Sequence, residues 1–406
     1  MRILSITAFY TPFVIGGAEM CAQNLTDWFV ANGHEAAVLT AAPTPADEQW
    51  GADKDGYKVY RVSTPHLYPV AATNQQPGWK KPIWHMQDIL DPRNEAVFDR
   101  VIAEFKPDFI HIHWIQGLGY NGLKVIARHG IPTAITLHDL ALACVRTTMF
   151  RGIDECAGQC GTCKFSAKVK MGYLRQLPRL GFISPSQANL DRVAELLPID
   201  DYPKFHILNP NRYPAPTVRH SPQARTRLLF VGRLEETKGI NFLLGILDTL
   251  SKDFDFHLTV LGKGPEEPRL REQYGHHDWL ELKGHVPQQE VSDIMATSDL
   301  LITPSLWAEN SPGVVIQALA NGLPVMGSDK GGLPELIQPG ENGMLVPPGD
   351  EALWRAAITD VLRYPEKMAA LRESTIRSAD RFDYDRLGRQ IMAALEHIAA
   401  QPARAA

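Results

Sequence analysis

The order of short β-rich runs and helical stretches constrains the fold of this chain more than any other feature. Six such runs stand in the first half of the sequence, at residues 2–7, 35–40, 58–63, 109–113, 133–137 and 182–184. A second series begins near residue 205, with runs at residues 228–231, 257–261, 280–282, 300–303, 324–326 and 344–346. Strands that alternate with helices are typical of parallel sheets built from β-α-β units. The sequence therefore predicts an α/β protein with two doubly wound, Rossmann-like sheets.

The length of the chain agrees with two domains. A chain of 406 residues is too long for one hydrophobic core. The stretch from residue 198 to residue 222 contains six prolines and is typical of a linker. We expect an N-terminal domain over residues 1–198, a C-terminal domain over residues 205–384, and a helix at about 385–400 for which packing back on the first domain is open. Ligands of open α/β sheets bind beyond the carboxyl ends of the strands, so we expect a site in a central cleft that both domains face.

Composition and charge exclude several classes of protein. Hydrophobic residues make up 44% of the chain and charged residues 21%, as in ordinary globular proteins. The net charge of -5 leaves no global basic field, which disfavours a nucleic-acid partner. No apolar run reaches the roughly 20 residues of a membrane-spanning helix, and the N-terminus is typical of a first strand rather than a signal peptide. With five cysteines and no secretion signal, the sequence favours a cytoplasmic protein.

Two glycines, Gly16 and Gly17, precede the first predicted helix. Glycines at this position let backbone N–H groups approach a phosphate, and the helix N-terminus adds a positive dipole. The pattern is not G-x-G-x-x-G, so a nicotinamide or flavin cofactor is not indicated. A plain tight turn is the alternative explanation.

Two cations follow the first strand of the second series. Arg233 comes directly after Gly232 and the strand, and Lys238 comes directly before the next helix. In the predicted fold both side chains can reach one point of the cleft. Fixed cations there would stabilise the negative charge that develops on a departing diphosphate. A pair of solvated surface cations is the alternative.

An acidic and a basic side chain follow other predicted strands. Glu309 lies in a loop before a helix for which Ser311 is the expected N-cap and Pro312 the first residue. A carboxylate there can accept hydrogen bonds from sugar hydroxyls, while the helix N-terminus faces phosphates. His138 ends the run at residues 133–137, where it can donate a hydrogen bond or handle a proton. The alternatives are an exposed loop acid and a capping histidine.

These motifs, in this order, resemble the large GT-B-fold family of retaining glycosyltransferases called family 4. The resemblance covers nearly the whole chain. It rests on GGAE at residues 16–19, TLHD at 136–139, ILNP at 207–210, GRLEETKG at 232–239, VLGKG at 260–264, SLWAENSPGVVIQALANGLPV at 305–325, GGLPELI at 331–337 and NGMLVPPGD at 342–350.

The resemblance implies a role for each matching residue. It implies that His138 lies beside the transferred sugar, that Glu309 holds the hydroxyls of that sugar, and that Arg233 and Lys238 clamp the diphosphate. The donor-binding residues that it implies are Gly16, Gly17, Asn209, Gly232, Ser311, Gly313 and Gln317. Gln317 departs from the family, whose second glutamate, eight residues after the first, binds the nucleotide ribose. A neutral amide can still bond to a ribose diol, but the donor nucleotide is then less firmly indicated.

The resemblance also implies the reaction. It is the transfer of a hexosyl group from a UDP- or GDP-sugar to a glycan or lipid-linked acceptor, with retention of anomeric configuration, in the synthesis of cell-surface polysaccharide or glycoconjugate. Either the acceptor attacks on the face from which the diphosphate leaves, or a carboxylate forms a covalent intermediate. The loop position of Glu309 suits sugar binding and favours the first route. No metal or other cofactor is implied for catalysis, and we interpret two D-x-D sequences, at 253–255 and 383–385, as structural.

Four of the five cysteines form a C-x11-C-x3-C-x2-C cluster, made of Cys144, Cys156, Cys160 and Cys163. Four thiolates this close in sequence could bind a structural zinc ion and rigidify an acceptor-side loop. The spacing is not the usual pair of C-x2-C motifs, so free thiols or disulfides remain the alternative. Cys21 is expected to be a buried core thiol.

The segment that follows the cysteines is basic and contains no acid. Its cations are Lys164, Lys168, Lys170, Arg175 and Arg179, interleaved with apolar residues from Phe165 to Leu174. Such a segment can lie on the anionic inner face of the membrane and present a lipid-linked acceptor. Residues 79–81, Trp-Lys-Lys, give a second and weaker indication of membrane contact. We favour a solvated helix face for the basic segment.

Other functions on the same fold remain to be weighed. A non-catalytic nucleotide-sugar-binding subunit of a glycan-assembly complex would explain Gln317, but the presence of His138, Arg233, Lys238 and Glu309 argues against it. A nucleotide-sugar epimerase needs acid and base carboxylates that the sequence does not offer. A sugar phosphorylase needs a pyridoxal-binding lysine, which nothing in the sequence marks.

Overall fold

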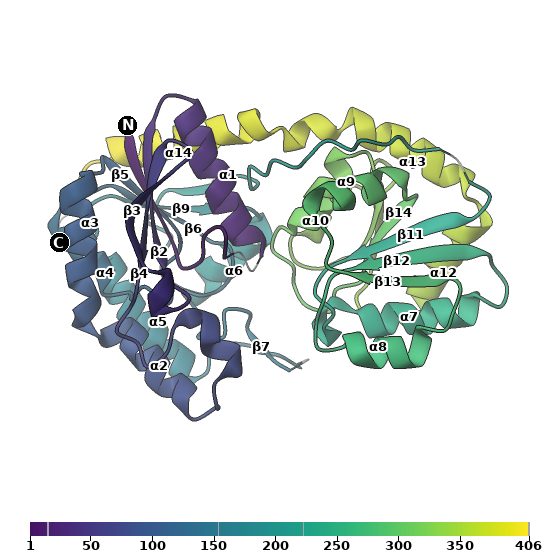
Figure 1. Cartoon of the computed structure of the whole chain (residues 1–406), viewed down its shortest axis with the longest axis horizontal. Helices are drawn as coiled ribbons and strands as arrows, with labels where there is room; N and C mark the ends of the chain where they lie inside the picture. The colour runs from purple at the N-terminus through teal and green to yellow at the C-terminus, as the bar shows by residue number, and fades with distance from the viewer. Residues whose placement is uncertain (14–15, 153, 222, 405–406) are drawn as a thin grey trace. The chain divides into compact units, whose positions relative to one another are not determined.

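The computed structural model describes residues 1–13, 16–152, 154–221 and 223–404, which divide into two compact units (Figure 1). Within those residues, unit 1 comprises 1–151, 156–211 and the C-terminal segment from Tyr384, and unit 2 comprises 152–155 and 212–383. The chain passes from one unit to the other at residues 211–212, inside the proline-rich stretch. Pro222, the far limit of that stretch, lies outside the described residues. None of the described helices is both long and apolar enough to cross a membrane.

Unit 1 is built on an eight-stranded sheet of order β10-β9-β6-β5-β1-β2-β4-β3. Its strands are β1 (Arg2–Thr7), β2 (Glu35–Ala41), β3 (Gln49–Lys54), β4 (Tyr57–Val62), β5 (Phe109–Trp114), β6 (Thr133–Thr136), β9 (Leu180–Ser184) and β10 (Lys204–His206). All neighbours pair in parallel except β3, which is antiparallel to β4. The six strands predicted for this half are confirmed. The sequence did not predict β3, a polar edge strand, or β10, which has only three residues.

The helices of unit 1 cover both faces of the sheet. They are α1 (Gly17–Ala31), α2 (Lys80–Leu90), α3 (Glu95–Phe105), α4 (Gly122–Arg128), α5 (Gly161–Leu174), α6 (Gln187–Leu196) and α14 (Tyr384–Ala400), with short 3-10 turns at Pro45–Asp47, Val70–Gln75 and Pro92–Asn94 and a small hairpin of β7 (Phe150–Arg151) and β8 (Asp154–Glu155). Helix α14 lies beside α1 in Figure 1, and Trp28 Nε1 donates to Asp385 Oδ1 at 3.1 Å. The C-terminal helix is therefore part of unit 1, because its apolar face completes the core that α1 leaves open.

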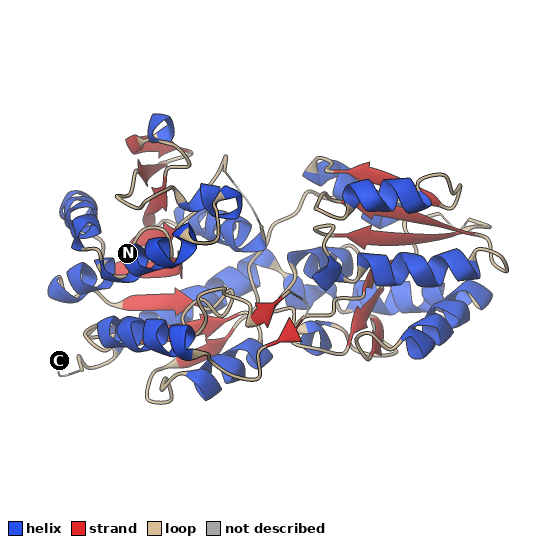
Figure 2. Ribbon diagram, turned by 90° about the horizontal axis from the view of Figure 1, so that it is seen from below, coloured by secondary structure: helices blue, strands red, loops and turns tan. Residues whose placement is uncertain are grey.

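Unit 2 is built on a six-stranded, fully parallel sheet of order β13-β12-β11-β14-β15-β16. Its strands are β11 (Thr226–Val231), β12 (Phe256–Leu261), β13 (Leu280–Gly284), β14 (Leu300–Thr303), β15 (Val325–Ser328) and β16 (Gly343–Val346). Its helices are α7 (Ile240–Leu250), α8 (Glu267–Tyr274), α9 (Gln288–Thr297), α10 (Gly313–Ala320), α11 (Leu333–Leu336), α12 (Glu351–Arg363) and α13 (Glu366–Arg377), with 3-10 turns at Glu236–Lys238 and Ala379–Phe382. Figures 1 and 2 show helices on both faces of this sheet.

Each sheet reverses its winding direction once. In unit 1 the chain moves outward from β1 and then returns to its other side at β5, so β1 and β5 are neighbours. In unit 2 the same reversal makes neighbours of β11 and β14. The loops that follow two such strands run in opposite directions and leave a crevice at their carboxyl ends, which is where open α/β sheets bind ligands.

Candidate functional site

The reversal in unit 2 brings Lys238 against Glu309, two residues that are 71 positions apart in the sequence. Lys238 ends the 3-10 turn that follows β11, and Glu309 lies in the loop that follows β14. Lys238 Nζ donates to Glu309 Oε1 at 2.7 Å, and Ser305 Oγ donates to the same oxygen at 2.7 Å. The ammonium group also lies 4.6 Å from the centre of the Trp307 ring, a favourable cation–π contact. The two adjacent loops therefore share one polar centre.

Glycines allow the loops of this centre to approach closely. Gly239 has φ +73°, and a Cβ on it would lie 2.0 Å from the carbonyl oxygen of Pro304. Gly331, after β15, has φ +64°, and a Cβ there would lie 2.3 Å from the carbonyl oxygen of Glu309. A larger residue at either position would push the loops apart as well as strain the backbone. The glycines thus hold the main chain of Glu309 in place, while Lys238 and Ser305 hold its side chain.

The carboxyl group of Glu309 is buried and ionised. Burial by itself would raise the pKa of Glu309, but the charge of Lys238 and hydrogen bonds from Lys238 and Ser305 outweigh that effect, so the pKa lies below its ordinary value. The group is therefore a fixed hydrogen-bond acceptor. An ammonium group has three N–H donors, so Lys238 can hold Glu309 and an anionic ligand at the same time.

The other predicted cation, Arg233, lies in the loop directly after β11. Its side chain is 58% exposed, and its Nε pairs with Glu235 Oε1 at 3.0 Å. Gly232, just before it, donates its N–H to the carbonyl of Leu261 at 3.0 Å and packs against Gly262. Arg233 is thus on the same strand end as Lys238, with its guanidinium group accessible to solvent.

The start of helix α10 differs from the prediction. The helix begins at Gly313 with Pro312 as its N-cap and without a side-chain cap, so the expected capping role of Ser311 is wrong. Proline fixes the backbone at the cap, and the Ser311 hydroxyl oxygen is buried with no hydrogen-bond partner among the described residues. The carbonyl of Gly313 accepts a hydrogen bond from the Tyr213 hydroxyl at 2.8 Å.

Both the oxygen and the nitrogen of the Gln317 side-chain amide form hydrogen bonds with a neighbouring helix. The residue is 3% exposed, its Oε1 accepts from Gln288 Nε2 at 2.8 Å, and its Nε2 donates to Ser292 Oγ at 3.1 Å. Both partners belong to α9. The amide group therefore ties α10 to α9, a function that a glutamate could not perform in the same way because a carboxylate has no N–H donor.

A row of histidines marks the reversal in unit 1. His111 and His113 alternate along β5, and His138 follows β6 by two residues. His113 Nδ1 lies 3.0 Å from His138 Nε2 in a hydrogen bond, and His111 Nε2 lies 2.7 Å from Thr136 Oγ1. The rings of His113 and His138 are stacked, with centroids 5.3 Å apart. The predicted residue His138 is thus oriented by His113, which the sequence analysis did not single out.

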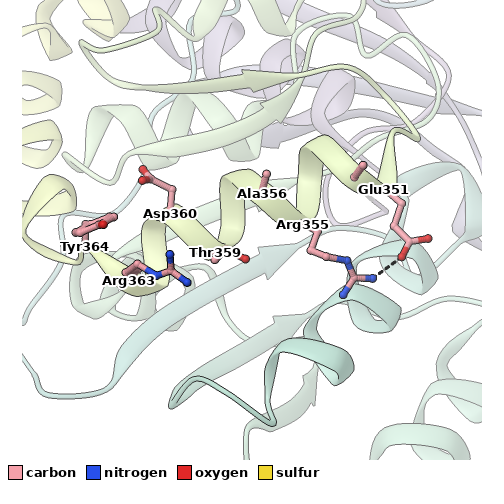
Figure 3. Close-up of a pocket in the computed structure, with 8 residues that line it drawn as sticks. Glu351, Arg355, Ala356, Thr359, Asp360, Arg363 and Tyr364 are labelled. Atoms are coloured by element: carbon pink, nitrogen blue, oxygen red, sulfur yellow. Dashed lines mark hydrogen bonds and ion pairs between the residues drawn. The ribbon is translucent and has the colours of Figure 1, made fainter.

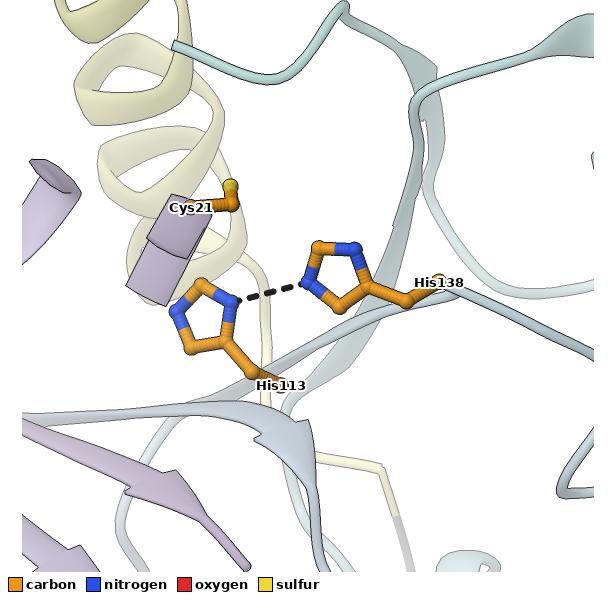
Figure 4. A group of neighbouring side chains, drawn as sticks. All are labelled: Cys21, His113 and His138. Carbon is orange, nitrogen blue, oxygen red and sulfur yellow. Dashed lines mark hydrogen bonds between the residues drawn. The ribbon is translucent and has the colours of Figure 1, made fainter. Parts of the chain in front are cut away.

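Figure 4 shows a cysteine close to this pair. Cys21, on α1, offers its sulfur to the same space, and the candidate ligand atoms of Cys21, His113 and His138 all lie within 4.8 Å of one another. The Cys21 thiol is 2% exposed, as predicted for a core thiol, and donates to Asn209 Oδ1 at 3.3 Å. The predicted donor-binding residue Asn209 therefore contacts α1 through its side chain.

Burial keeps all three histidines neutral. Loss of solvation lowers the pKa of His138 to about 4 and that of His111 to about 3, and it also lowers the pKa of His113 well below the ordinary value. A cavity of about 30 Å³, enough for a water molecule, is lined by His113, His138 and Asp139 among others. A neutral imidazole here can donate one hydrogen bond and accept another.

A buried lysine lies close to Asp139, the residue that follows His138. Lys170, on α5, is 3% exposed and donates from Nζ to the carbonyl of Ala141 at 2.6 Å. Burial lowers the pKa of Lys170 to about 8 and raises that of Asp139 to about 6, while the two opposite charges attract. The prediction of a solvated basic helix face is wrong for Lys170. Along α5, Met171, Tyr173 and Leu174 are also buried, whereas Lys164, Phe165 and Lys168 are exposed.

In unit 1, the glycine loop before α1 is bonded to the carboxylate of Glu19. Gly16 is the N-cap of α1, Gly17 is its first residue, and the N–H of Gly16 donates to Glu19 Oε2 at 2.7 Å. A side chain on Gly17 would meet open space. The start of this helix is therefore accessible at Gly17, with the Glu19 carboxylate already bonded to the preceding residue.

The two D-x-D sequences have structural contacts. Asp255 pairs with Arg225 at 2.8 Å at the start of β12, and Asp385 accepts the hydrogen bond from Trp28 described above.

Figure 3 shows a broad hollow along α12. Its lining residues come from that helix and its C-cap residue Tyr364, and they include Glu351, Arg355 and Arg363. A ligand there would be held from one side only, and none of the predicted site residues contributes to it. We therefore assign the site to the strand ends and not to this hollow.

Two Rossmann-like units that each gather polar side chains at the carboxyl ends of their strands define a GT-B glycosyltransferase. The family described as "Glycosyl transferases group 1" matches residues 225–364, and the one described as "Glycosyl transferase 4-like domain" matches residues 16–155. Together the two matches cover more than two thirds of the chain. The chain belongs to the group 1 family of glycosyl transferases, and it is an enzyme.

Individual relatives and structures agree with this family. A glycogen synthase of Mycobacterium tuberculosis (strain CDC 1551 / Oshkosh) is 25% identical over 391 residues, which cover 90% of this chain and 87% of the relative. A GDP-mannose-dependent alpha-mannosyltransferase of the same strain is 26% identical over 365 residues, which cover 86% and 85%. The structure of a sucrose-phosphate synthase from Thermosynechococcus elongatus aligns with a TM-score of 0.76 at 18% identity, over 98% of this chain and 99% of that one.

We predict that removing one partner of the Lys238–Glu309 pair costs more than removing both. In Lys238→Met the Glu309 carboxylate stays buried without its counter-ion, and we expect a loss of about 3–5 kcal/mol in the free energy of unfolding. The double variant Lys238→Met/Glu309→Gln should recover a large part of this loss. Urea unfolding of the two single variants and the double variant gives the coupling energy. The surface pair Arg355–Glu351 on α12 is the matched control, for which we expect less than about 1 kcal/mol. Equal coupling for the two pairs would contradict the prediction.

We predict that acidification below about pH 6.5 destabilises the protein through the histidine row. The folded-state pKa values of His111, His113 and His138 lie below the unfolded value, so the unfolded chain binds more protons. The stability is complete above that pH and falls by about 1.4 kcal/mol per pH unit for each such histidine. Urea unfolding between pH 5 and pH 7.5 should show a smaller slope in His111→Gln, whereas the exposed His276→Gln should keep the slope. An unchanged slope in His111→Gln would refute this account.

Proposed function

We propose that the enzyme is a retaining hexosyltransferase that moves a sugar from a UDP- or GDP-sugar to a glycan or lipid-linked acceptor. The observation that carries this proposal is the Lys238–Glu309 centre at the strand reversal of unit 2. It combines a fixed cation for a diphosphate with a fixed acceptor for sugar hydroxyls. The relative named as GDP-mannose-dependent supports a nucleotide-sugar donor, and the one named as a glycogen synthase supports a glycan acceptor.

In the proposed reaction, the bond from the anomeric carbon to the diphosphate breaks, and a bond to the acceptor oxygen forms on the same face. The leaving diphosphate takes the proton of the acceptor hydroxyl. Lys238 and the accessible Arg233 stabilise the negative charge as it grows on the diphosphate. Glu309 binds hydroxyls of the sugar, because Lys238 and Ser305 hold its carboxylate through Oε1 and a carboxylate can accept further hydrogen bonds on Oε2. His138, held neutral by burial, donates a hydrogen bond to the sugar.

A non-catalytic nucleotide-sugar-binding subunit is the second candidate. Gln317 favours this candidate, because it stands where the family has a ribose-binding glutamate. Its amide is instead hydrogen-bonded to Gln288 and Ser292 within unit 2. The ordered centre around Lys238 favours the enzyme, since a protein that only binds a donor has no need to stabilise charge on a leaving group.

We predict that the purified protein releases nucleoside diphosphate from one donor in a panel of UDP- and GDP-sugars, and that Arg233→Ala and Lys238→Ala slow this release by about 10²–10³-fold. Arg233 is exposed, so its variant tests the charge without disturbing the fold. The variant Arg355→Ala removes a cation of α12 that pairs with Glu351 instead of the site residues, so it is the control and should keep the rate. Binding of one donor, with release in neither the presence nor the absence of glycan and lipid-linked acceptors, would favour the binding subunit instead.

An exposed apolar stripe on α2 supports the lipid-linked acceptor. Trp79, Ile83, Met86 and Leu90 recur at spacings of four, three and four residues and are between 42% and 68% exposed. The opposite face of the helix is buried through Trp84 and Ile89. Lysines lie on this helix and on a helix that contacts it. Lys80 and Lys81 belong to α2, and the exposed Lys164 and Lys168 belong to α5. An apolar stripe with lysines beside it is typical of a helix that lies in the interface of an anionic membrane.

We predict that the protein binds vesicles of phosphatidylglycerol and phosphatidylcholine, and that Ile83→Glu/Met86→Glu lowers the bound fraction at least about tenfold, because two apolar side chains no longer leave water. Co-sedimentation measures the binding, which should weaken in high salt. Leu353→Glu, an exposed apolar residue of α12, is the matched control. Equal binding of both variants would place the contact elsewhere, and equal binding to pure phosphatidylcholine would contradict the role of the lysines.

A further inference from the structure

Three side chains that can bind a metal ion meet at one point of unit 1. Cys21 lies on α1, His113 on β5, and His138 two residues after β6. One ligand atom of each lies within 4.8 Å of the other two, and His113 Nδ1 is 3.0 Å from His138 Nε2. Figure 4 shows the sulfur beside the two hydrogen-bonded imidazoles. The three residues are far apart in the sequence, so only the folded chain gathers them.

The spacing of the ligand atoms suits a single zinc ion. Zinc binds histidine nitrogens at about 2.0–2.1 Å and a thiolate sulfur at about 2.3 Å. In tetrahedral geometry these bonds place two nitrogens about 3.3 Å apart, and a nitrogen and a sulfur about 3.6 Å apart. The two imidazole nitrogens are already close to that separation. The sulfur, at no more than 4.8 Å from either nitrogen, needs a movement of only about 1 Å.

The types of ligand select zinc over the common hard cations. Imidazole and thiolate bind zinc well, whereas magnesium and calcium require oxygen ligands. Cys21 and His113 are 2% and 4% exposed, so water does not compete for their ligand atoms. His138 is only partly buried, which gives an ion a path from solvent. Three protein ligands with an open fourth position are typical of zinc sites that also hold a water molecule.

The contacts that the three side chains make without an ion are weak and replaceable. The Cys21 thiol donates to Asn209 Oδ1 at 3.3 Å, and the two imidazoles share one N–H···N bond. Zinc displaces the proton of a coordinating thiol, which is released to solvent. The proton shared by the imidazoles moves to a ring nitrogen that does not face the ion. Three coordinate bonds then replace two hydrogen bonds.

The charges near the cluster favour a cation. Zinc with one thiolate and two neutral imidazoles carries a net charge of about +1. The buried Glu19 precedes Cys21 by two residues on α1, and Asp139 directly follows His138. The carboxyl groups of Glu19 and Asp139 are close enough to interact with each other. Lys170 offsets one of these two negative charges, so the other can balance the ion.

The cysteines that the sequence indicated as zinc ligands do not form a comparable site. They are Cys144, Cys156, Cys160 and Cys163, and over the part of the chain that the structure describes no three of their sulfurs lie close enough to share an ion. Cys163 Sγ contacts Cys144 Sγ at 3.8 Å. All four are free thiols, which was the alternative that the sequence left open.

We propose that Cys21, His113 and His138 bind one zinc ion and that this ion inhibits the transferase. The inhibition rests on the proposed function, in which His138 lies beside the transferred sugar. That sugar gains positive charge as its bond to the diphosphate breaks. A cation held beside it therefore raises the barrier, in the opposite sense to the fixed cations that stabilise the leaving diphosphate.

The first test measures binding without activity. Full-length protein, kept reduced and stripped of metal with a chelator, is titrated with zinc against a chromophoric competitor, and with cobalt as a spectroscopic probe. We expect one metal ion per chain and thiolate-to-cobalt charge-transfer absorption. Cys21→Ser and His113→Gln should each weaken zinc binding at least about 100-fold, because each removes a ligand rather than an outer-sphere partner. Cys160→Ser, which removes a partly exposed thiol outside the cluster, is the matched control and should keep the metal.

Thermal unfolding of each variant shows that it is folded, and either ligand variant suffices if the other is not. The proposal is overturned if the stripped protein takes up no metal, or if a folded Cys21→Ser or His113→Gln binds zinc as tightly as the unchanged protein. Loss of the metal in Cys160→Ser alone would also overturn it, since the ion would then belong to the other cysteines.

The second test separates the metal site from the reaction. Release of nucleoside diphosphate should slow at least about tenfold when zinc saturates the protein, recover after addition of a chelator, and stay unchanged by zinc in Cys21→Ser. Zinc bound through Cys21 with no effect on the rate would overturn the inhibition. A protein that binds zinc through Cys21 but releases no nucleoside diphosphate without zinc would support the metal site and contradict the proposed function.

Discussion

The ion pair between Lys238 and Glu309 exists only because β11 and β14 are neighbours in the sheet of unit 2. The sheet reverses its winding direction there, so the loops after the two strands leave it side by side. Gly239 lets these two loops approach to backbone contact, and Gly331 lets the loop after β15 approach Glu309 in the same way. Ser305 supplies a second hydrogen bond to the carboxylate. A buried carboxylate without Lys238 would be an uncompensated charge, so the geometry of the loops and the ionisation of Glu309 depend on each other.

The strand reversal in unit 1 brings together a different type of side chain. There the side chains are imidazoles, which burial keeps neutral, and His113 orients His138 through one hydrogen bond. The proposed reaction would use both environments. Fixed cations suit a diphosphate whose charge increases, and a neutral hydrogen-bond donor suits a sugar that carries no charge. One principle of open α/β sheets thus positions two unlike groups of residues in a single chain.

Several residues near the two centres connect elements rather than bind ligands. Gln317 joins α10 to α9, and Asn209 joins the last segment of unit 1 to Cys21 on α1. Lys170 joins α5 to the loop after β6, and Cys163 on the same helix contacts Cys144 in that loop. The loop that begins after His138 is therefore fixed by contacts from α5 at two places, which matters because that loop has little regular structure of its own.

The sequence by itself determined the order of strands and helices, the division into two Rossmann-like sheets, and which strand ends carry polar residues. These features depend on periodicity and on residue types in short segments, and all twelve predicted strands are present. Only the tertiary structure decided which of those polar residues meet. In the folded chain Lys238 pairs with Glu309, and Gln317 forms hydrogen bonds with α9. Lys170 is buried, and the N-cap of α10 is Pro312 instead of Ser311. Those outcomes depend on contacts between segments far apart in the chain, which local pattern cannot specify.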